Sequence, residues 1–340
     1  GSAEAVRLLL EDQRADPRML DSRVLFAAVG KESVEIVRLL LRDQRADPAA
    51  LDSRVLAIAA GKGSVEIVRL LLEDRRADPT ALDSRVLSTT AGSGSIDIVR
   101  LLLEDGRAEP AAMGNRALRL AAVRGRTNVV QLLLHRINPA ADLGFDLFAI
   151  AARRDNPGLV RLLLQDARAD PAAGDSKALR IAAAEGFAEV VDLLLQSGRA
   201  KPEALESEAL RHAAAERHLD VLDLLLKDGN SDPAARDSEA LRMAASSGYT
   251  DIVATLLRNG RADPAAGEPN ALEEAFECED AEIVALLLQD GRVSPGARGA
   301  EEFEKAVSSE NIPMARVLSW YGYGRTSISD GGNSKRRKSS

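Results

Sequence analysis

Apolar residues recur along this chain as leucine-rich triplets with a fixed period. Successive triplets start 31 residues apart, with one step of 30, at Leu8, Leu39, Leu70, Leu101, Leu132, Leu162, Leu193, Leu224, Thr255 and Leu286. Ten of the thirteen prolines keep the same period, at Pro17, Pro48, Pro79, Pro110, Pro139, Pro171, Pro202, Pro233, Pro264 and Pro295. Two markers in phase indicate a chain of stacked repeats rather than one large core.

Residues 238–264 show what one repeat predicts. A first run has Leu241 and Ala245 at helical spacing and ends before Gly248. A second helical run follows and stops at Gly260, as a helix commonly does. Each repeat is therefore expected to form helix, turn, helix and loop.

Serine is expected to begin the second helix in three of the repeats. Ser33, Ser64 and Ser95 stand at that point, each with an acid two residues later, which is typical of an N-cap. A helix pair this small cannot bury its own apolar face, so neighbouring pairs must stack.

The repeats resemble ankyrin repeats. In one repeat, residues 178–183 fill the first-helix segment, Gly186 the turn, and residues 190–195 the second helix. The resemblance covers nearly the whole chain and implies an all-α, ankyrin-like helix-pair solenoid of about eleven repeats. Two residues are missing after the loop that contains Pro202 and its equivalents, so we expect shortened β-hairpin and loop segments.

The domain prediction is a solenoid over residues 1–323, with a first repeat truncated at its N-terminus, and a disordered basic tail over 324–340. Trp320, Tyr321 and Tyr323 are expected to cover the end of the last helix pair. Four basic residues in the tail resemble a nuclear-import signal: Lys335, Arg336, Arg337 and Lys338. A solvated tail without a targeting role is the alternative.

Arginine recurs at one loop position, at Arg14, Arg45, Arg76, Arg107, Arg168, Arg199, Arg261 and Arg292. A residue required in every repeat serves what every repeat needs. We therefore interpret these arginines as structural: each pairs with a nearby acid and tethers its loop to the next repeat. The acids expected to pair are Asp16, Asp47, Asp78, Asp170 and Asp263. An anion-binding ladder is the alternative.

Binding specificity is expected where the repeats differ. By the ankyrin resemblance, the two positions before the turn glycine face a concave groove. The candidate partner-binding residues at or beside these positions are Lys31, Lys62, Arg124, Arg126, Arg153, Arg154, Glu185, Glu216 and Glu277. Basic residues fall in the N-terminal half and acidic ones in the C-terminal half. This suits a bipolar partner or two partners, and an uncorrelated solvated surface is the alternative.

One repeat, around Pro139, is irregular. The loop after Leu134 is two residues shorter than in the other repeats and the next stretch is one residue longer. The repeat also contains Arg153 and Arg154. We expect a local kink or a special site here, with sequence decay in one repeat as the alternative.

Composition narrows the functional classes. A formal net charge of −8 disfavours a whole-chain role in binding nucleic acid. One cysteine, Cys278, permits no intramolecular disulfide and favours a cytoplasmic protein, with the nucleus as the alternative. Apolar runs reach only about five residues where a membrane span needs about twenty, so no membrane insertion is expected. The three histidines lack cysteine partners at zinc-ligand spacing, so no metal or cofactor is expected.

These features predict a monomeric protein that binds another protein and is not an enzyme. The first hypothesis is a non-catalytic protein–protein interaction scaffold that binds a macromolecular partner along its concave face, without a small-molecule substrate. One alternative is the substrate-recognition arm of a larger regulatory protein, such as a ubiquitin-ligase adaptor. Another is a nuclear, nucleic-acid-associated protein, which the overall acidity disfavours.

Overall fold

The computed structural model describes residues 2–12, 16–17, 19–137, 146–166 and 168–324, without the side chains of residues 19–22 and 82–83. The chain divides into two compact units, unit 1 (Gly1–Ala173) and unit 2 (Gly174–Ser340), each of which we describe by itself. Every regular element in the described part is an α-helix, and no strand occurs there. The predicted all-α architecture is confirmed.

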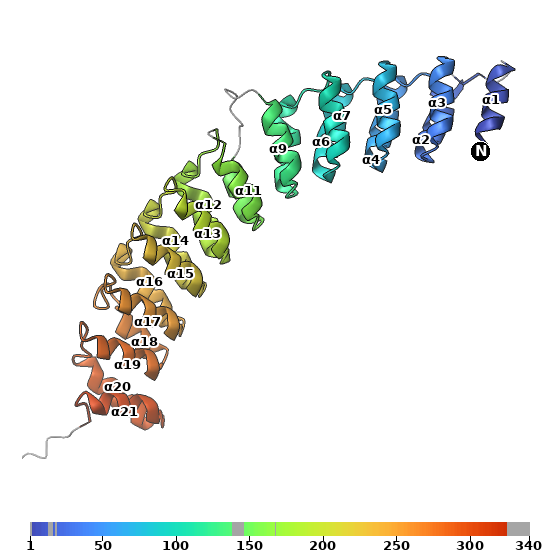
Figure 1. The fold of residues 1–340 in the computed structure, drawn as a ribbon. Coiled ribbons are helices and arrows are strands. Elements are labelled where there is room, and N and C mark those ends of the chain that lie inside the picture. Colours follow the sequence, from blue (N-terminus) through green and yellow to red (C-terminus); the bar gives the residue numbers. More distant parts are fainter. Residues whose placement is uncertain (1, 13–15, 18, 138–145, 167, 325–340) are drawn as a thin grey trace, which may run out of the picture. The chain divides into compact units, whose positions relative to one another are not determined.

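Unit 1 begins with a single helix, which corresponds to the second helix of a pair, and five complete helix pairs follow it (Figure 1). Its helices are α1 (Ala3–Glu11), α2 (Met19–Gly30), α3 (Val34–Asp43), α4 (Ala50–Lys62), α5 (Val65–Asp74), α6 (Ala81–Ser93), α7 (Ile96–Asp105), α8 (Ala112–Val123), α9 (Thr127–Arg136), α10 (Leu147–Arg153) and α11 (Pro157–Leu164). First helices contact first helices, from α2 to α4 and onward to α10. Second helices contact second helices in the same way, so the unit has two layers.

Unit 2 repeats the same arrangement with five further pairs. Its helices are α12 (Ala173–Glu185), α13 (Ala188–Gln196), α14 (Ala204–Ala215), α15 (Leu219–Asp228), α16 (Ala235–Ser246), α17 (Thr250–Asn259), α18 (Ala271–Glu277), α19 (Ala281–Asp290), α20 (Arg298–Ser308) and α21 (Ile312–Trp320). The even-numbered helices α2–α20 are called the first-helix layer below, and the odd-numbered helices the second-helix layer.

The core of each unit lies between its two layers. In the repeat formed by α16 and α17, Leu241, Ala245, Ile252 and Leu256 are all completely buried. Gly248 adopts the left-handed conformation (φ 73°) in the turn between these helices. The leucine and alanine periodicity of the sequence therefore corresponds to the buried faces of stacked helix pairs.

A left-handed turn opens the first helix of several repeats, where ankyrin repeats would have a β-hairpin. Leu51, Asp52 and Ser53 all adopt φ between 51° and 56°. The same three-residue turn occurs at 113–115, 174–176, 205–207 and 236–238. Such a conformation costs about 1–2 kcal/mol per non-glycine residue. In four of these turns the third residue is a buried serine that accepts a hydrogen bond from the loop after the second helix of the same repeat, and this bond helps to hold the turn.

Substituting glycine in such a turn is expected to stabilise the protein. Leu205 is 47% exposed and has φ 51°, so its side chain adds strain and little packing. Leu205→Gly removes this strain at some entropic cost, for a net gain of about 0.5–1 kcal/mol in the free energy of unfolding. Urea denaturation followed by circular dichroism measures the change.

Leu205→Ala is the matched control, because it removes the same exposed side chain but keeps the strained Cβ. We expect no gain from alanine. Glycine and alanine variants of equal stability would show that the left-handed turn carries no strain.

The prediction that serine side chains cap the second helices is wrong, although the serines occupy the predicted position. Ser33, Ser64 and Ser95 stand at the N-cap position, but none of their side chains bonds to the helix. The hydroxyl of Ser64 instead donates to the Glu32 carboxylate of the previous repeat, at 3.2 Å. True caps occur in the less regular repeats, where Asn156 accepts from the Leu159 amide at 2.9 Å.

The irregular repeat differs at its first helix. Helix α10 has seven residues, whereas α4 has thirteen, and it has no left-handed turn. It begins instead at Asp146, whose side chain accepts a hydrogen bond from the Ala149 amide at 2.8 Å. The loop around Pro139 lies outside the described residues, and so does the tail with Lys335, Arg336, Arg337 and Lys338.

The aromatic cluster at the end of α21 was predicted to cover the last helix pair, and this is wrong for Trp320. Its side chain is 86% exposed, and that of Tyr321 is 39% exposed. Tyr323 alone packs inward, against Gly299 of α20. The Tyr323 ring takes this place against α20 because Gly299 has no Cβ to exclude it, and Trp320 remains exposed.

Candidate binding surface

The nine candidate residues share one place in the repeat. Each lies in the last turn of a first helix, or in the short turn that leads to the second helix, and each is exposed. The last residues of α4, α10, α12 and α18 are Lys62, Arg153, Glu185 and Glu277, respectively. Helices α8, α10 and α14 are followed directly by Arg124, Arg154 and Glu216. Lys31 follows α2, and Arg126 precedes α9. They form the rim of the first-helix layer.

The two charge types fall in different units. All six basic candidates lie in unit 1 and all three acidic ones in unit 2. Arg124 and Arg153 belong to neighbouring repeats, because α8 contacts α10. Arg126 has a structural contact as well, since its Nε donates to the Gly92 carbonyl at 3.5 Å. Glu277 forms an ion pair with Arg298.

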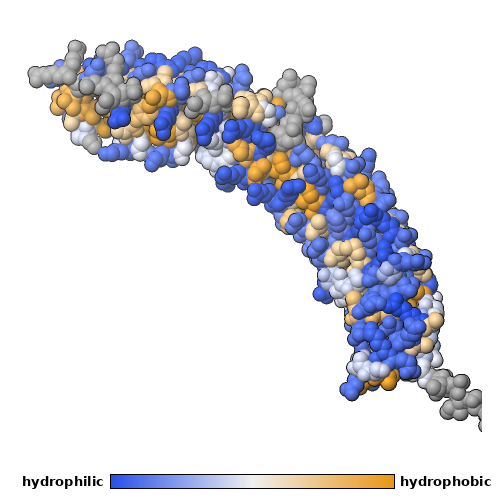
Figure 2. All heavy atoms as spheres, turned by 180° about the vertical axis from the view of Figure 1, so that it is seen from behind, coloured by the Kyte–Doolittle hydropathy of each residue, from blue (hydrophilic) through white to orange (hydrophobic). Residues whose placement is uncertain are grey.

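The surface drawn in Figure 2 is mostly hydrophilic, with separate hydrophobic patches. Large exposed apolar side chains in unit 1 include Leu8, Leu9 and Val24 at one end, and Leu51 and Met113 in the left-handed turns. Recognition on this protein is therefore expected to depend on charged and polar side chains more than on one continuous apolar groove.

Five of the recurring loop arginines are structural, as interpreted, but their partners differ from those predicted. Arg14 lies outside the described residues. Arg76 binds Asp74, two residues earlier, with Nε 2.7 Å and Nη2 2.9 Å from the two carboxylate oxygens. The same bidentate pair forms at Arg45–Asp43, Arg107–Asp105, Arg168–Asp166 and Arg292–Asp290. The acid two residues earlier lies closer because the loop turns sharply after the second helix.

These arginines tether their loops to the previous repeat and not to the next one. Nη1 of Arg76 donates to the carbonyls of Gln44 and Ala46, both at 2.9 Å. Nη1 of Arg292 donates likewise to the carbonyls of Gly260 and Ala262. Carbonyls at the end of a helix have no partner within that helix, so the guanidinium caps them. The predicted acids still act at longer range: Asp47 raises the pKa of Arg76 electrostatically, after the larger effect of Asp74.

The hydrogen bonds from Arg45, Arg168 and Arg292 lower the pKa of their carboxylate partners. These bonds are the largest cause of the lowered pKa of Asp43, Asp166 and Asp290, and partial burial opposes them. A carboxyl whose pKa is lower in the folded than in the unfolded chain stabilises the fold above the unfolded pKa of about 4. That contribution is lost as the pH falls through the folded pKa.

Neutralising these three acids is expected to flatten the acid limb of the stability profile. Wild type should lose stability steeply between about pH 5 and pH 2, whereas Asp43→Asn/Asp166→Asn/Asp290→Asn should start lower and change less. Urea midpoints across this range measure the slope. The control replaces three exposed acids of the second-helix layer with glutamine, at Glu73, Glu104 and Glu282. Equal slopes in the two variants would contradict the assignment.

Buried serines tie the start of a first helix to the loop that closes the same repeat, and the sequence analysis missed these bonds. The Ser53 hydroxyl, 2% exposed, accepts a hydrogen bond at 2.7 Å from the Asp78 amide, which lies in the loop after α5. Equivalent bonds join Ser176 to Lys201, Ser207 to Asp232 and Ser238 to Asp263, at 2.7–2.8 Å. Each serine ends a left-handed turn, and each donor amide precedes one of the periodic prolines. Their shared 31-residue period was the available signal.

Unit 2 has a third link, between first helices. Arg180 donates to the Glu208 carboxylate at 2.8 Å, and Arg211 donates to that of Glu239 at 2.6 Å. The arginines also donate to backbone carbonyls of their own left-handed turns. The guanidinium of Arg180, for example, donates to the carbonyls of Gly174 and Asp175. The arginine that stands where ankyrin repeats have histidine is therefore a structural residue in unit 2.

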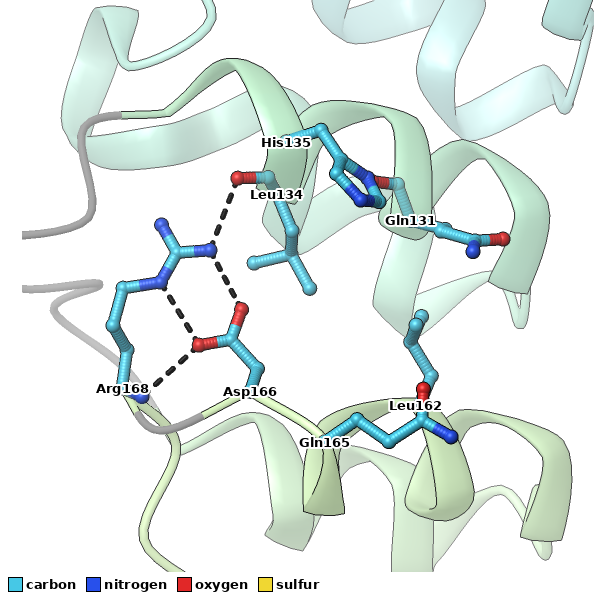
Figure 3. Close-up of a pocket in the computed structure, with 7 residues that line it drawn as sticks. All are labelled: Gln131, Leu134, His135, Leu162, Gln165, Asp166 and Arg168. Carbon is cyan, nitrogen blue, oxygen red and sulfur yellow. Dashed lines mark hydrogen bonds and ion pairs between the residues drawn. The ribbon is translucent and has the colours of Figure 1, made fainter.

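A hollow of about 480 Å³ lies between α9 and α11 in the irregular repeat (Figure 3). Arg168 and Asp166 line it, but they bind each other, and Nη2 of Arg168 also donates to the Leu134 carbonyl at 3.0 Å. His135 turns back on its own helix, with Nδ1 2.7 Å from the Gln131 carbonyl. Because its strongest polar groups are engaged with one another, this hollow is a gap between second helices and gives no sign of a built ligand site.

Among the described residues, no group of three potential metal ligands occurs. Burial, and then Glu274, Asp280 and Glu277, raise the pKa of the Cys278 thiol, which also donates to the Ser246 carbonyl at 2.9 Å. A raised thiol pKa makes a poor nucleophile. In the described part of the chain, no helix is both long and apolar enough to cross a bilayer.

The two stacked helix layers, the links between successive repeats and the exposed, variable rim define a helical repeat protein of the interaction type. The chain belongs to the ankyrin repeat family: a family model described as ankyrin repeats (3 copies) matches residues 1–83, 56–143, 148–237 and 212–298. Ankyrin repeats generally mediate protein–protein interactions and are typically non-catalytic.

Solved structures similar to this chain include the crystal structure of the ankyrin repeat domain of Bcl-3, a unique member of the IkappaB protein family. The two sequences are 24% identical, the TM-score is 0.48, and the match covers 68% of this chain and 97% of that one. No curated protein matches the chain.

Proposed function

We propose that this protein is a non-catalytic scaffold that binds a partner protein along the exposed face of its first-helix layer. The proposed solenoid comprises residues 1–323. One observation carries the proposal: the buried positions of successive first helices repeat leucine and alanine, whereas the exposed positions at the rim change from repeat to repeat. Identical core positions serve stacking, so the variable exposed positions remain available to distinguish partners.

The nine rim residues are proposed as partner contacts. Their charges support recognition by many polar contacts on a rigid surface, in which electrostatic complementarity sets specificity and association rate. The second-helix layer is the less suited face, because some of its exposed charges are paired within the layer. Arg69, for example, lies 3.7 Å from Glu66, three residues earlier on α5.

Site-specific photo-crosslinking tests the proposal. A photoreactive amino acid replaces Lys62 or Glu216 at the rim of the first-helix layer, and Glu104 or Lys227, exposed on second helices, in control proteins. After irradiation in an extract of the source cells, mass spectrometry identifies the proteins attached at each position. We expect attachment of a defined partner from the rim positions. The same partner attached equally from the control positions, or only from them, would contradict the assignment of this face.

A further inference from the structure

Unit 1 carries a ladder of cations along its first-helix layer. Arg23, Arg54, Arg85 and Arg116 stand at one position in α2, α4, α6 and α8, always 31 residues apart. Arg23, Arg54 and Arg85 are exposed and Arg116 is half-buried. Successive first helices contact one another, so the four arginines form one row across four repeats. We call this row the arginine ladder.

The ladder is not neutralised within unit 1. Across the described residues, none of its four arginines forms an ion pair or a side-chain hydrogen bond. Arg54 forms no ion pair with Asp52 either, although Asp52 is exposed and lies only two residues earlier in the chain.

Unit 2 is different at the same helical position. Glu208 and Glu239 replace the arginine there, and Arg180 and Arg211 of the preceding repeats bind them. At the positions equivalent to Arg180, α4 and α6 of unit 1 have Ala57 and Ser88, which supply no charge. Lys177 of α12 stands at the same position and is also a cation, but in α14 and α16 the charges at this position are paired within unit 2. Among the described residues of unit 1, by contrast, the four arginines form a row of cations without ion pairs.

A second, neutral row runs beside the ladder. Four residues after each arginine, and therefore on the same helix face, stand Ala27, Ile58, Thr89 and Leu120. All four are at least partly exposed. The surface thus offers a cation and a small or apolar contact in every repeat, in a fixed order.

The spacing of the ladder suits an extended peptide. Packed helices lie about 8–10 Å apart, and an extended chain in the polyproline II conformation rises about 3.1 Å per residue with three residues per turn. One turn of such a peptide therefore spans about one repeat and places every third side chain on the same face. An acid at every third position would meet each arginine in turn, and a residue between two acids would lie beside the neutral row.

We propose that the arginine ladder of unit 1 binds an extended acidic segment of a partner protein, with carboxylates spaced three residues apart. This inference rests on the proposed function and names the chemistry of its partner. A nucleic-acid strand is the less suited occupant, because the chain has a net charge of −8, which repels a polyanion at long range. A short acidic segment meets only the local positive row.

The test uses the full chain and labelled synthetic peptides in fluorescence anisotropy. One peptide of about twelve residues has glutamate at every third position among serine and threonine, and its isomer has the same glutamates side by side. The ladder variant is Arg54→Gln/Arg85→Gln/Arg116→Gln. The matched control is Arg38→Gln/Arg69→Gln/Arg100→Gln, which removes three charges with the same 31-residue spacing from the second-helix layer.

We expect the spaced peptide to bind wild type about fivefold more tightly than its isomer, and the ladder variant to lose about tenfold in affinity. The control variant should keep wild-type affinity, and binding should weaken as salt rises from about 0.05 to about 0.3 M. Circular dichroism establishes that both variants stay folded. Equal losses in the two variants, or no preference between the peptides, would overturn the proposal.

Two further outcomes distinguish a failure of the acidic-peptide proposal from a failure of the proposed function. An oligothymidylate of similar length that binds more tightly than the spaced peptide, and loses affinity in the ladder variant alone, would reassign the ladder to nucleic acid. A partner that crosslinks to the rim of the first-helix layer while no acidic peptide binds would overturn the acidic chemistry and leave the proposed function standing.

Discussion

Replacing Arg168 with alanine is expected to lower the free energy of unfolding by about 3 kcal/mol. The side chain is 15% exposed, and its Nε and Nη2 lie 2.9 and 2.6 Å from the carboxylate oxygens of Asp166. Its guanidinium also donates to the carbonyls of Leu134 and Ile137 in the previous repeat. Alanine would leave the mostly buried carboxylate and at least one helix-end carbonyl without their donor.

Urea denaturation followed by far-ultraviolet circular dichroism measures this loss. Arg168→Lys should recover only part of it, because an ammonium group cannot make the bidentate contact and reach two carbonyls together. Arg100→Ala, an exposed change on α7, is the control and should cost less than about 0.5 kcal/mol.

A second readout makes the assignment of Arg168 specific. Since the bond from Arg168 is the largest cause of the lowered pKa of Asp166, that pKa should return toward its ordinary value in Arg168→Ala. In a double-mutant cycle, Arg168→Ala should cost much less when Asp166 is already asparagine. Additive costs would show that the arginine acts through packing alone.

Ser207→Val is expected to destabilise the protein by about 3 kcal/mol or more. Ser207 is 1% exposed, and its hydroxyl accepts from the Asp232 amide at 2.7 Å. Valine removes this acceptor, adds volume at a closed site, and places a β-branched side chain in a left-handed conformation with φ 56°. All three effects destabilise the same contact, which joins the start of α14 to the loop after α15.

The effect of Ser207→Val separates into its parts with two companion variants. Ser207→Ala keeps the volume small and tests the lost hydrogen bond alone, for which we expect about 1–3 kcal/mol. Ser247→Val changes an exposed serine in a right-handed conformation and should be close to neutral. Thermal and urea unfolding report each change. A neutral Ser207→Val would mean that the serine bond does not hold the loop after α15 to the start of α14.

The sequence predicted the helices and their stacking with little help from tertiary structure. Leucine and alanine at helical spacing, a glycine between the runs, and a stop at Gly260 are local signals, and they place α16 and α17 as observed. Apolar side chains have one way to leave water in a short helix pair, which is against the neighbouring pairs. The family followed from the same local pattern.

The links between repeats were predicted less well, because they depend on which atoms the stacking brings together. Sequence distance did not show that Arg76 would bind Asp74 and also cap carbonyls of the previous repeat. The end of a helix leaves carbonyls without partners, and the guanidinium is the nearest donor once the repeats are packed. The buried serines were missed for a similar reason, since each serine becomes an acceptor only when the loop after the second helix folds back against the start of the first helix.

Tertiary structure alone decided which charges of the first-helix layer remain unpaired. Arg54 and Glu208 occupy the same position of the repeat, and in sequence each is a charged residue on a helix surface. Stacking places Glu208 within 2.8 Å of Arg180, 28 residues earlier, whereas the equivalent neighbour of Arg85 is Ala57, also 28 residues earlier. An ion pair needs opposite charges within about 4 Å. The sequence determined the repeated helices, and their register in the stack determined which cations of unit 1 stay unpaired.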